Sequence, residues 1–260
     1  MEIRGGGSWM KSLVVSVFVV GAGLCVIGGA FAIQLETQAE KAANLQKQAK
    51  GGLFNHWNFD KPATNEPLAG FVFLNVGEGP DATWLVQPDA SAPSPPNAIQ
   101  AKSACPSSHC YRLLIAQGLD YEYPDLTVRV RAVFEQGRAV GGAVFGLKDA
   151  KNFYAGVVDL TQNTIEVVRV VDGAEQVLGQ EPIKPKAVSW HTLRIQRNTI
   201  ISTDFIEMSF DGQVVLSVQD QALGLGQVGL LMRGNAALQF DSFHVIPLFS
   251  QRPFSPPAAY

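Results

Sequence analysis

Residues 206–218 read Ile-Glu-Met-Ser-Phe-Asp-Gly-Gln-Val-Val-Leu-Ser-Val, and this stretch decides the fold class. Ile206, Met208 and Phe210 alternate with polar residues, which is the pattern of a strand with one buried and one solvated face. Asp211-Gly212 follows, and this dipeptide favours a two-residue type I′ turn because both central residues of that turn need positive φ. A second apolar run comes next, so the stretch predicts a β-hairpin.

The same alternation recurs on both sides of this hairpin. Asp125–Phe134 and Leu193–Gln196 show it clearly, and Asp172-Gly173 marks a second turn. Further short apolar runs bounded by turn residues are Phe71–Asn75, Trp84–Gln87, Arg112–Ala116, Ala143–Leu147, Phe153–Leu160, Thr164–Val171, Val228–Met232 and Leu238–Ile246. Many short strands at turn spacing predict an all-β chain, an antiparallel β-sandwich of the jelly-roll type.

Composition and charge narrow the function classes. The chain has 260 residues, with 20 Lys and Arg against 23 Asp and Glu, so its net charge is −3. Proteins that bind nucleic acid need a basic face to replace the counterions of the phosphates, and no such excess exists here. The 25 glycines and 15 prolines suit a turn-rich β-protein, and we expect no nucleic-acid partner.

The N-terminal segment indicates export. Ser12–Leu35 holds no charged residue, Arg4 and Lys11 precede it, and Ala30-Phe-Ala32 follows the pattern of a signal-peptide cleavage site. Leu13–Ile33 is also long enough for an uncleaved anchor, because about 20 apolar residues span a bilayer. Both alternatives place the rest of the chain outside the cytoplasm, in the periplasm or secreted, and the second attaches it to the inner membrane.

The chain divides into four parts. Residues 1–35 form the signal peptide or membrane anchor, and residues 36–52 are rich in Ala, Gln, Glu and Lys, which favour a helical spacer. Residues 53–247 carry the strand pattern and form the sandwich domain. Residues 248–260 are a proline-rich tail, and Gln87–Asn97 is a proline-rich loop inside the domain.

Cys105 and Cys110 are the cysteines of the exported part. Two cysteines in an exported domain usually pair, so we predict a disulfide that closes a short polar loop. His109 lies between them, which leaves a metal site as the alternative. A structural zinc site needs four ligands, and no second Cys/His pair is present to complete the set.

Several motifs occur in an order that is familiar as a whole. They are Trp57-Asn-Phe-Asp60, Gly142–Asp149, Asn152-Phe-Tyr154, Trp190–Ile195, Phe210-Asp-Gly212, Gly226–Leu230 and Phe240–Phe243, and they extend over about Leu53 to Pro247. In this order the domain resembles the concanavalin A-like lectin/glucanase superfamily, in particular the bacterial laminin-G-like domains related to the 3-keto-disaccharide hydrolase group. The resemblance implies the β-sandwich fold, and members include lectins, glycan-binding modules, glycosidases and adhesion domains.

The catalytic patterns of these relatives are missing. Retaining glycosidases need two carboxyl groups about 5 Å apart, which on one strand face would read E-x-D, and the sequence has no such pair. The Asn-Ser-Gly segment common in the keto-disaccharide hydrolase relatives is replaced by Gly141-Gly142-Ala143. The four histidines are scattered, and none belongs to a Ser/His/Asp order. We therefore expect no catalytic residues and no cofactor.

The candidate ligand site consists of polar residues on strands: Arg129, Arg131, Tyr154, Asp159 and Arg169. Alternation places Arg129 and Arg131 on one face, about 7 Å apart along the strand. Such like charges repel each other unless an acid or an anionic ligand lies between them, and Asp159 is the acid expected there. If Asp159 pairs only one of them, the other is free to bind a sugar hydroxyl or an acidic glycan. The alternative is a solvated sheet face.

Two further expectations concern packing and metal. Trp190, Phe210 and Phe240 are predicted to pack in the core. The resemblance implies a calcium ion where the first and last strands meet, and Asp60 and Asp241 would supply oxygen ligands there. The alternative is that these two acids cap turns.

The leading function is an extracytoplasmic, non-catalytic module that binds a saccharide or an envelope polymer. The first alternative is a sugar-active enzyme of the keto-disaccharide hydrolase kind. The second is an interaction subunit with an envelope protein as its partner, which an exposed apolar patch would favour.

Overall fold

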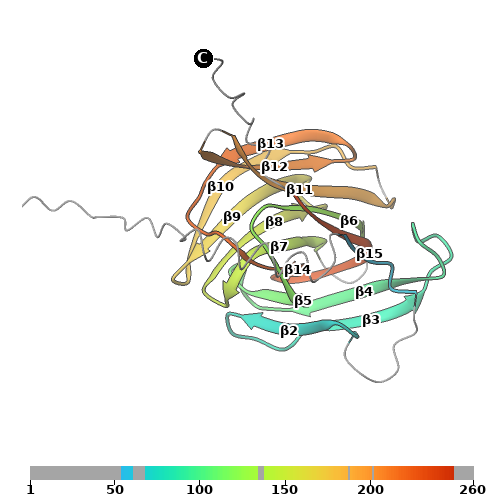
Figure 1. Ribbon diagram of the computed structural model, residues 1–260. Helices are drawn as coiled ribbons and strands as arrows, with labels where there is room; N and C mark the ends of the chain where they lie inside the picture. The colour runs from blue at the N-terminus through green and yellow to red at the C-terminus, as the bar shows by residue number, and fades with distance from the viewer. Residues whose placement is uncertain (1–53, 61–67, 134–137, 187, 201, 249–260) are drawn as a thin grey trace, which may run out of the picture. The chain divides into compact units, whose positions relative to one another are not determined.

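The computed structural model describes residues 54–60, 68–133, 138–186, 188–200 and 202–248. Within these ranges the chain is all-β: strands form two antiparallel sheets that pack against each other, and no helix occurs (Figure 1). No helix that could cross a membrane was found in the described part of the chain. The predicted signal peptide or anchor, the spacer and nearly all of the tail lie outside the described residues.

The eight-stranded sheet contains the strand that ends the domain. Its order is β13 (Gln213–Gln219), β12 (Thr203–Phe210), β11 (His191–Ile200), β6 (Pro124–Ala132), β15 (Asn235–Pro247), β4 (Asn97–Ala104) and β3 (Thr83–Pro88). β1 (Asn55–Trp57) pairs with β15, for example Trp57 with Phe243. The prediction that the first and last strands are adjacent is therefore confirmed.

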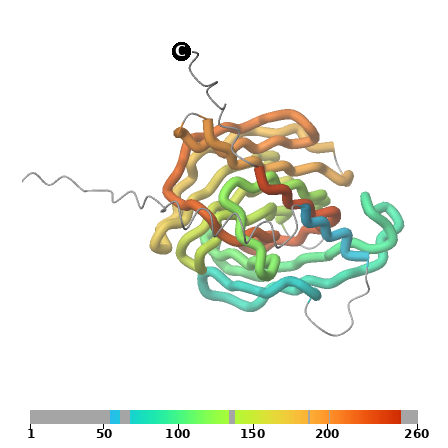
Figure 2. Tube along the Cα trace, viewed as in Figure 1, coloured from blue at the N-terminus to red at the C-terminus, as the bar shows by residue number. Residues whose placement is uncertain are grey.

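The seven-stranded sheet forms the other layer. Its order is β10 (Ala174–Pro182), β9 (Thr164–Val171), β8 (Asn152–Asp159), β7 (Val140–Asp149), β14 (Gly226–Arg233), β5 (Tyr111–Tyr121) and β2 (Phe71–Val76). In both sheets neighbouring strands are often far apart in sequence, as in β6 beside β15 and β14 beside β5 (Figure 2). This is the connectivity of a jelly roll rather than of a simple meander.

Both hairpin turns agree with the sequence prediction. Asp211 and Gly212 join β12 to β13 with φ of 48° and 83°, and Asp172 and Gly173 join β9 to β10 with φ of 51° and 81°. Positive φ at both central residues is what a type I′ turn requires, and it matches the twist of the flanking strands.

The core lies between the inward faces of the two sheets. Leu126, Val128 and Val130 of β6 are buried there, as are Phe210 and Phe240, which confirms the predicted packing of those two aromatics; the neighbouring strands add Leu193, Ile195 and Met208. The sheets approach closely at Gly156 of β8, where an added Cβ would lie 2.3 Å from Cδ1 of Ile195. A glycine at this position allows the close approach.

Three strands were absent from the sequence prediction, and one of them, β1, has only three residues. β4 reads Asn-Ala-Ile-Gln-Ala-Lys-Ser-Ala, and small residues take the place of the large β-formers that signal a strand. β10 contains a register shift between Val177 and Gly179, which interrupts its alternation. The residues of β10 are also largely exposed because it is an edge strand, so burial does not impose an apolar pattern on it.

Candidate functional site

Arg129 and Arg131 lie on β6 with their side chains on the outer face of the eight-stranded sheet. Val128, which precedes them, and Val130, which lies between them, are buried in the core. The alternation read from the sequence therefore places the two arginines correctly with respect to the sheet.

Arg131 is fully engaged by its neighbours. Its Nε donates to Oε1 of Gln239 on β15 at 2.8 Å, and Nη1 donates to Oγ of Ser91 at 2.7 Å. Nη2 forms an ion pair with Asp89, and the guanidinium lies 4.6 Å from the centre of the Trp190 ring. Burial opposes ionisation of Asp89, but hydrogen bonds from Ser91 and the charge of Arg131 outweigh it and lower the pKa. The charge of Arg131 is therefore neutralised.

Arg129 differs from Arg131 in having no partner. Its neighbours across the sheet are Thr192 on β11 and Asp241 on β15, yet it forms no hydrogen bond or ion pair within the described part of the chain. Its Nε is buried without an acceptor, and so is Nε1 of Trp190. We call Arg129, Arg131 and Trp190 the arginine platform. It combines one uncompensated cation, two unpaired N–H donors and an indole ring.

The structure does not bring the five predicted site residues together. Tyr154 and Arg169 are cross-strand partners on β8 and β9, and both bind Asp220 beside the core, where Tyr154 also accepts from the backbone N–H of Leu223 at 3.0 Å. Asp159 pairs with Arg138 at the end of the seven-stranded sheet. The expectation that Asp159 pairs with Arg129 or Arg131 is wrong, because it lies on the other sheet; Asp89 pairs with Arg131 instead.

The place of Trp190 in the platform and the partners of Arg131 were not predicted from the sequence. Trp190 was expected in the core, but it is half-buried under Arg131 on the outer face. Trp190 directly precedes β11, so the alternation along the strand does not predict on which face of the sheet its side chain lies. Asp89 and Ser91 lie in the proline-rich loop, whose path no local pattern determines. The only sequence signal for Asp89 was an acidic residue in the loop before β4. That signal is too weak to predict a partner for Arg131.

Asp60 and Asp241 lie near the junction of β1 and β15, close enough for their charges to interact. Asp241 is fully buried and accepts backbone N–H groups of Ser94 and Ser242, each at 2.7 Å. Burial raises the pKa of Asp241, and the charge of Asp60 adds to this effect. Oδ1 of Asp60 is buried without a partner in the described residues. Two acids with an unpaired oxygen fit the oxygen ligands of calcium, and the calcium site stays a prediction.

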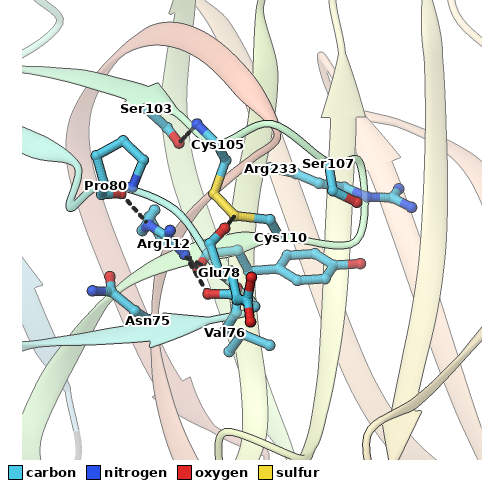
Figure 3. Close-up of a disulfide and its surroundings, with 12 residues drawn as sticks. Asn75, Val76, Glu78, Pro80, Ser103, Cys105, Ser107, Cys110, Arg112 and Arg233 are labelled. Atoms are coloured by element: carbon cyan, nitrogen blue, oxygen red, sulfur yellow. Dashed lines mark hydrogen bonds between the residues drawn. A yellow bond between two sulfur atoms is a disulfide. The ribbon is translucent and has the colours of Figure 1, made fainter.

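The predicted disulfide is confirmed: Cys105 and Cys110 are bonded, with their Cα atoms 6.0 Å apart (Figure 3). The loop that the disulfide closes contacts Arg233 of β14, whose Nε donates to the carbonyl oxygen of Ser108 at 2.6 Å. His109 is exposed and lies 3.1 Å from Glu175. No cluster of three or more metal-binding side chains occurs among the described residues.

A pocket of about 250 Å³ lies beside this loop, lined by Val76, His109, Tyr111, Val170, Gly173 and Glu175. Tyr111 on β5 donates to Glu175 on β10 at 2.8 Å, although four strands separate them in the sheet order. The outer face of the seven-stranded sheet is therefore strongly curved. Arg233 pairs with both Glu166 and Glu175. The polar groups here satisfy one another, unlike those of the arginine platform.

Comparisons with known proteins address the fold. No family model matches the chain, and no curated protein matches it in sequence. Among solved structures, it is similar to the carbohydrate-binding module CBM66 from Bacillus subtilis, with 17% identity and a TM-score of 0.51 over 67% of this chain and 93% of that one.

Two other solved structures are more distant. A protein of unknown function with a galectin-like fold from Bacillus subtilis has 8% identity and a TM-score of 0.49, over 69% of this chain and 90% of its own. The globular domain of T. cruzi calreticulin has 10% identity and a TM-score of 0.48, over 75% of this chain and 88% of its own. At these identities the likeness to CBM66 concerns the fold alone, an antiparallel β-sandwich, and the relation to the concanavalin A-like superfamily stays a prediction. The relation to laminin-G-like domains stays a prediction.

Proposed function

We propose that this protein is an extracytoplasmic, non-catalytic recognition module that binds a saccharide or envelope polymer carrying acidic groups at the arginine platform. The observation that carries the proposal is the half-buried Arg129, which has no partner in the described residues while Arg131 beside it is neutralised by Asp89.

The chemistry of the platform suits such a ligand. A guanidinium presents five N–H donors in a rigid fork that matches a carboxylate or phosphate in two parallel hydrogen bonds. The unpaired Nε1 of Trp190 adds a donor for a hydroxyl or acid oxygen. The name of CBM66, a carbohydrate-binding module, agrees with this assignment, since the fold is shared.

The test measures binding by the full-length chain, purified in mild detergent, first on a glycan array and then by calorimetry with the best ligand. Arg129→Ala should weaken binding at least tenfold, because truncating an arginine that forms charge-assisted hydrogen bonds removes about 1.5–3 kcal/mol. It should not lower the melting temperature, since Arg129 has no partner to lose and its truncation removes a buried unpaired donor.

The matched control is Arg138→Ala. Arg138 is about half exposed and pairs with Asp159 on the other sheet, so its loss should not change binding. Equal binding by wild type and Arg129→Ala would show that the platform is a solvated sheet face.

The second candidate function is a protein-interaction subunit, favoured by the exposed apolar residues Val72 and Phe73 on β2, an edge strand. The sugar-active enzyme is the weaker alternative. Ser189, His191 and Asp211 do form a hydrogen-bonded chain, contrary to the expectation from the sequence, but Nε2 of His191 also lies 2.9 Å from the carbonyl oxygen of Lys186.

A further inference from the structure

β2 is an edge strand that no other described strand covers. It reads Phe71-Val-Phe-Leu-Asn-Val76, with no charged residue and no proline, and it ends the order of the seven-stranded sheet. Val72 is 39% and Phe73 is 49% exposed. An exposed apolar edge offers unpaired backbone N–H and C=O groups to another strand, and natural proteins usually block such edges with charges, prolines or bulges.

The three other strands that end the two sheet orders in the described part of the chain have features that hinder pairing. β10 contains a register shift at Val177 and Gly179 and ends at Pro182, and β13 has a register shift against β12. β10 and β13 also lie against each other at the same side of the sandwich. β3 ends at Pro88. β2 has neither a proline nor a register shift against its partner β5.

The orientation of Phe73 is the second observation. Phe73 is paired with Leu114 of β5, which is paired with Leu230 of β14, so the three side chains share one face. Leu114 and Leu230 are fully buried in the core. Phe73 thus points toward the interior of the sandwich but remains half exposed, because at this side the core is open.

The register of β2 determines which backbone groups are free. Gln117 N–H donates to the carbonyl oxygen of Gly70, so residue 70 is bonded to β5. In an antiparallel pair the bonding direction alternates along the strand, so Val72 and Leu74 also bond to β5. Phe73 and Asn75 then direct their backbone N–H and C=O groups away from the sheet. Phe71 offers its carbonyl oxygen alone, because its N–H donates to the carbonyl oxygen of Leu68 at 3.0 Å.

We propose that β2 pairs with β2 of a second copy of this chain, antiparallel and with the two-fold axis at Phe73. This register places Phe73 opposite its own copy and Phe71 opposite Asn75, and these are the residues with outward backbone groups. No charged residue faces another, so the pairing meets no like-charge repulsion. A two-fold axis makes the interface self-complementary and closed, which limits the assembly to a dimer.

The dimer should be reversible. A single pair of six-residue strands is at the small end of specific interfaces, so we expect a dissociation constant of about 1–100 μM. The mass of the full-length chain in detergent, measured by light scattering after correction for the micelle, should rise from monomer to dimer across this concentration range.

Cysteine cross-linking tests the register, in a Cys25→Ser background so that the introduced thiol is the unpaired one. Opposed residues of a hydrogen-bonded antiparallel pair have Cα atoms about 5.5 Å apart, within the range for a disulfide. Phe73→Cys should therefore give a covalent dimer on mild oxidation. Val72→Cys is the matched control: it faces Leu74 of the copy, its own copy lies about 8 Å away, and it should stay monomeric.

A charge on β2 tests whether the edge drives association. Phe73→Lys should abolish the dimer, whereas Val177→Lys on the edge of β10, where Val177 is 45% exposed, should leave it intact. Circular dichroism confirms that both variants are folded. Wild type that stays monomeric at 100 μM, or a dimer that persists in folded Phe73→Lys, would overturn the proposal. Capture of a different protein's strand would appear as monomeric wild type.

Discussion

Nε of Arg129 is buried without an acceptor, and an unpaired buried donor costs about 1–3 kcal/mol of stability. The rest of the side chain remains in contact with solvent, so the charge itself keeps part of its hydration. A ligand oxygen that accepts a hydrogen bond from this Nε–H would remove the cost. Arg129 therefore has the character of a binding residue. Arg131, two residues away, has the opposite character because Asp89 and Gln239 satisfy it.

A second prediction at the residue scale concerns pH. His56 and His244 stack with ring centres 3.7 Å apart, and burial, followed by the charge of His56, lowers the pKa of His244 below 6.5. A histidine with a lowered pKa in the folded state binds a proton more readily in the unfolded chain. Protonation at low pH therefore favours unfolding. The protein should therefore lose stability as the pH falls through about 6.5, down to the folded-state pKa of His244.

His244→Phe keeps a stacking ring and removes the titration. Urea unfolding at pH 7.5 and pH 5.5 should show a smaller loss of stability for this variant than for wild type. The histidines outside this pair are common to both proteins and cancel in the difference. Parallel pH dependences would contradict the assignment.

At the scale of elements, the loop between β4 and β5 depends on its disulfide. Closing six residues restricts the unfolded chain, which corresponds to about 2 kcal/mol of stabilisation in the chain-entropy model. The Cys105→Ser/Cys110→Ser double variant should unfold at a correspondingly lower urea concentration. Its glycan binding should match that of wild type when folded, because Arg131 in the platform is held by Asp89, Ser91 and Gln239 rather than by this loop. A lost binding activity in a folded variant would place the ligand at the loop instead.

At the scale of the whole molecule, the ends of the domain meet where β1 pairs with β15. Asp60 follows β1, and Asp241 lies on β15, the last strand. A calcium ion bound by both residues would link these two ends of the domain. With a dissociation constant near 0.1 mM, 10 mM calcium should raise the melting temperature by about 5–10 °C. Asp241→Asn should show no such shift, and EDTA should reverse the shift in wild type. An equal response of both proteins would mean that Asp241 only caps a turn.

Local pattern was sufficient for most elements of the fold. Thr164–Val171 was expected and occurs with the same bounds, and the turns at Asp172-Gly173 and Asp211-Gly212 have the predicted conformation. These features depend on neighbours in sequence, since alternation and positive φ are properties of a few consecutive residues. β10 was missed because an exposed edge with a bulge does not need an apolar period.

The sequence by itself determined the fold class, the disulfide and the common face of Arg129 and Arg131. Only the tertiary structure decided that Tyr154, Asp159 and Arg169 lie apart from these arginines, and that Asp89 and Trp190 join them. The physical reason is the range of the interactions. Alternation determines the side of a strand on which a residue lies. Strand order across two sheets is set by packing between segments that can lie more than a hundred residues apart, as β4 and β15 do, and no local pattern encodes it.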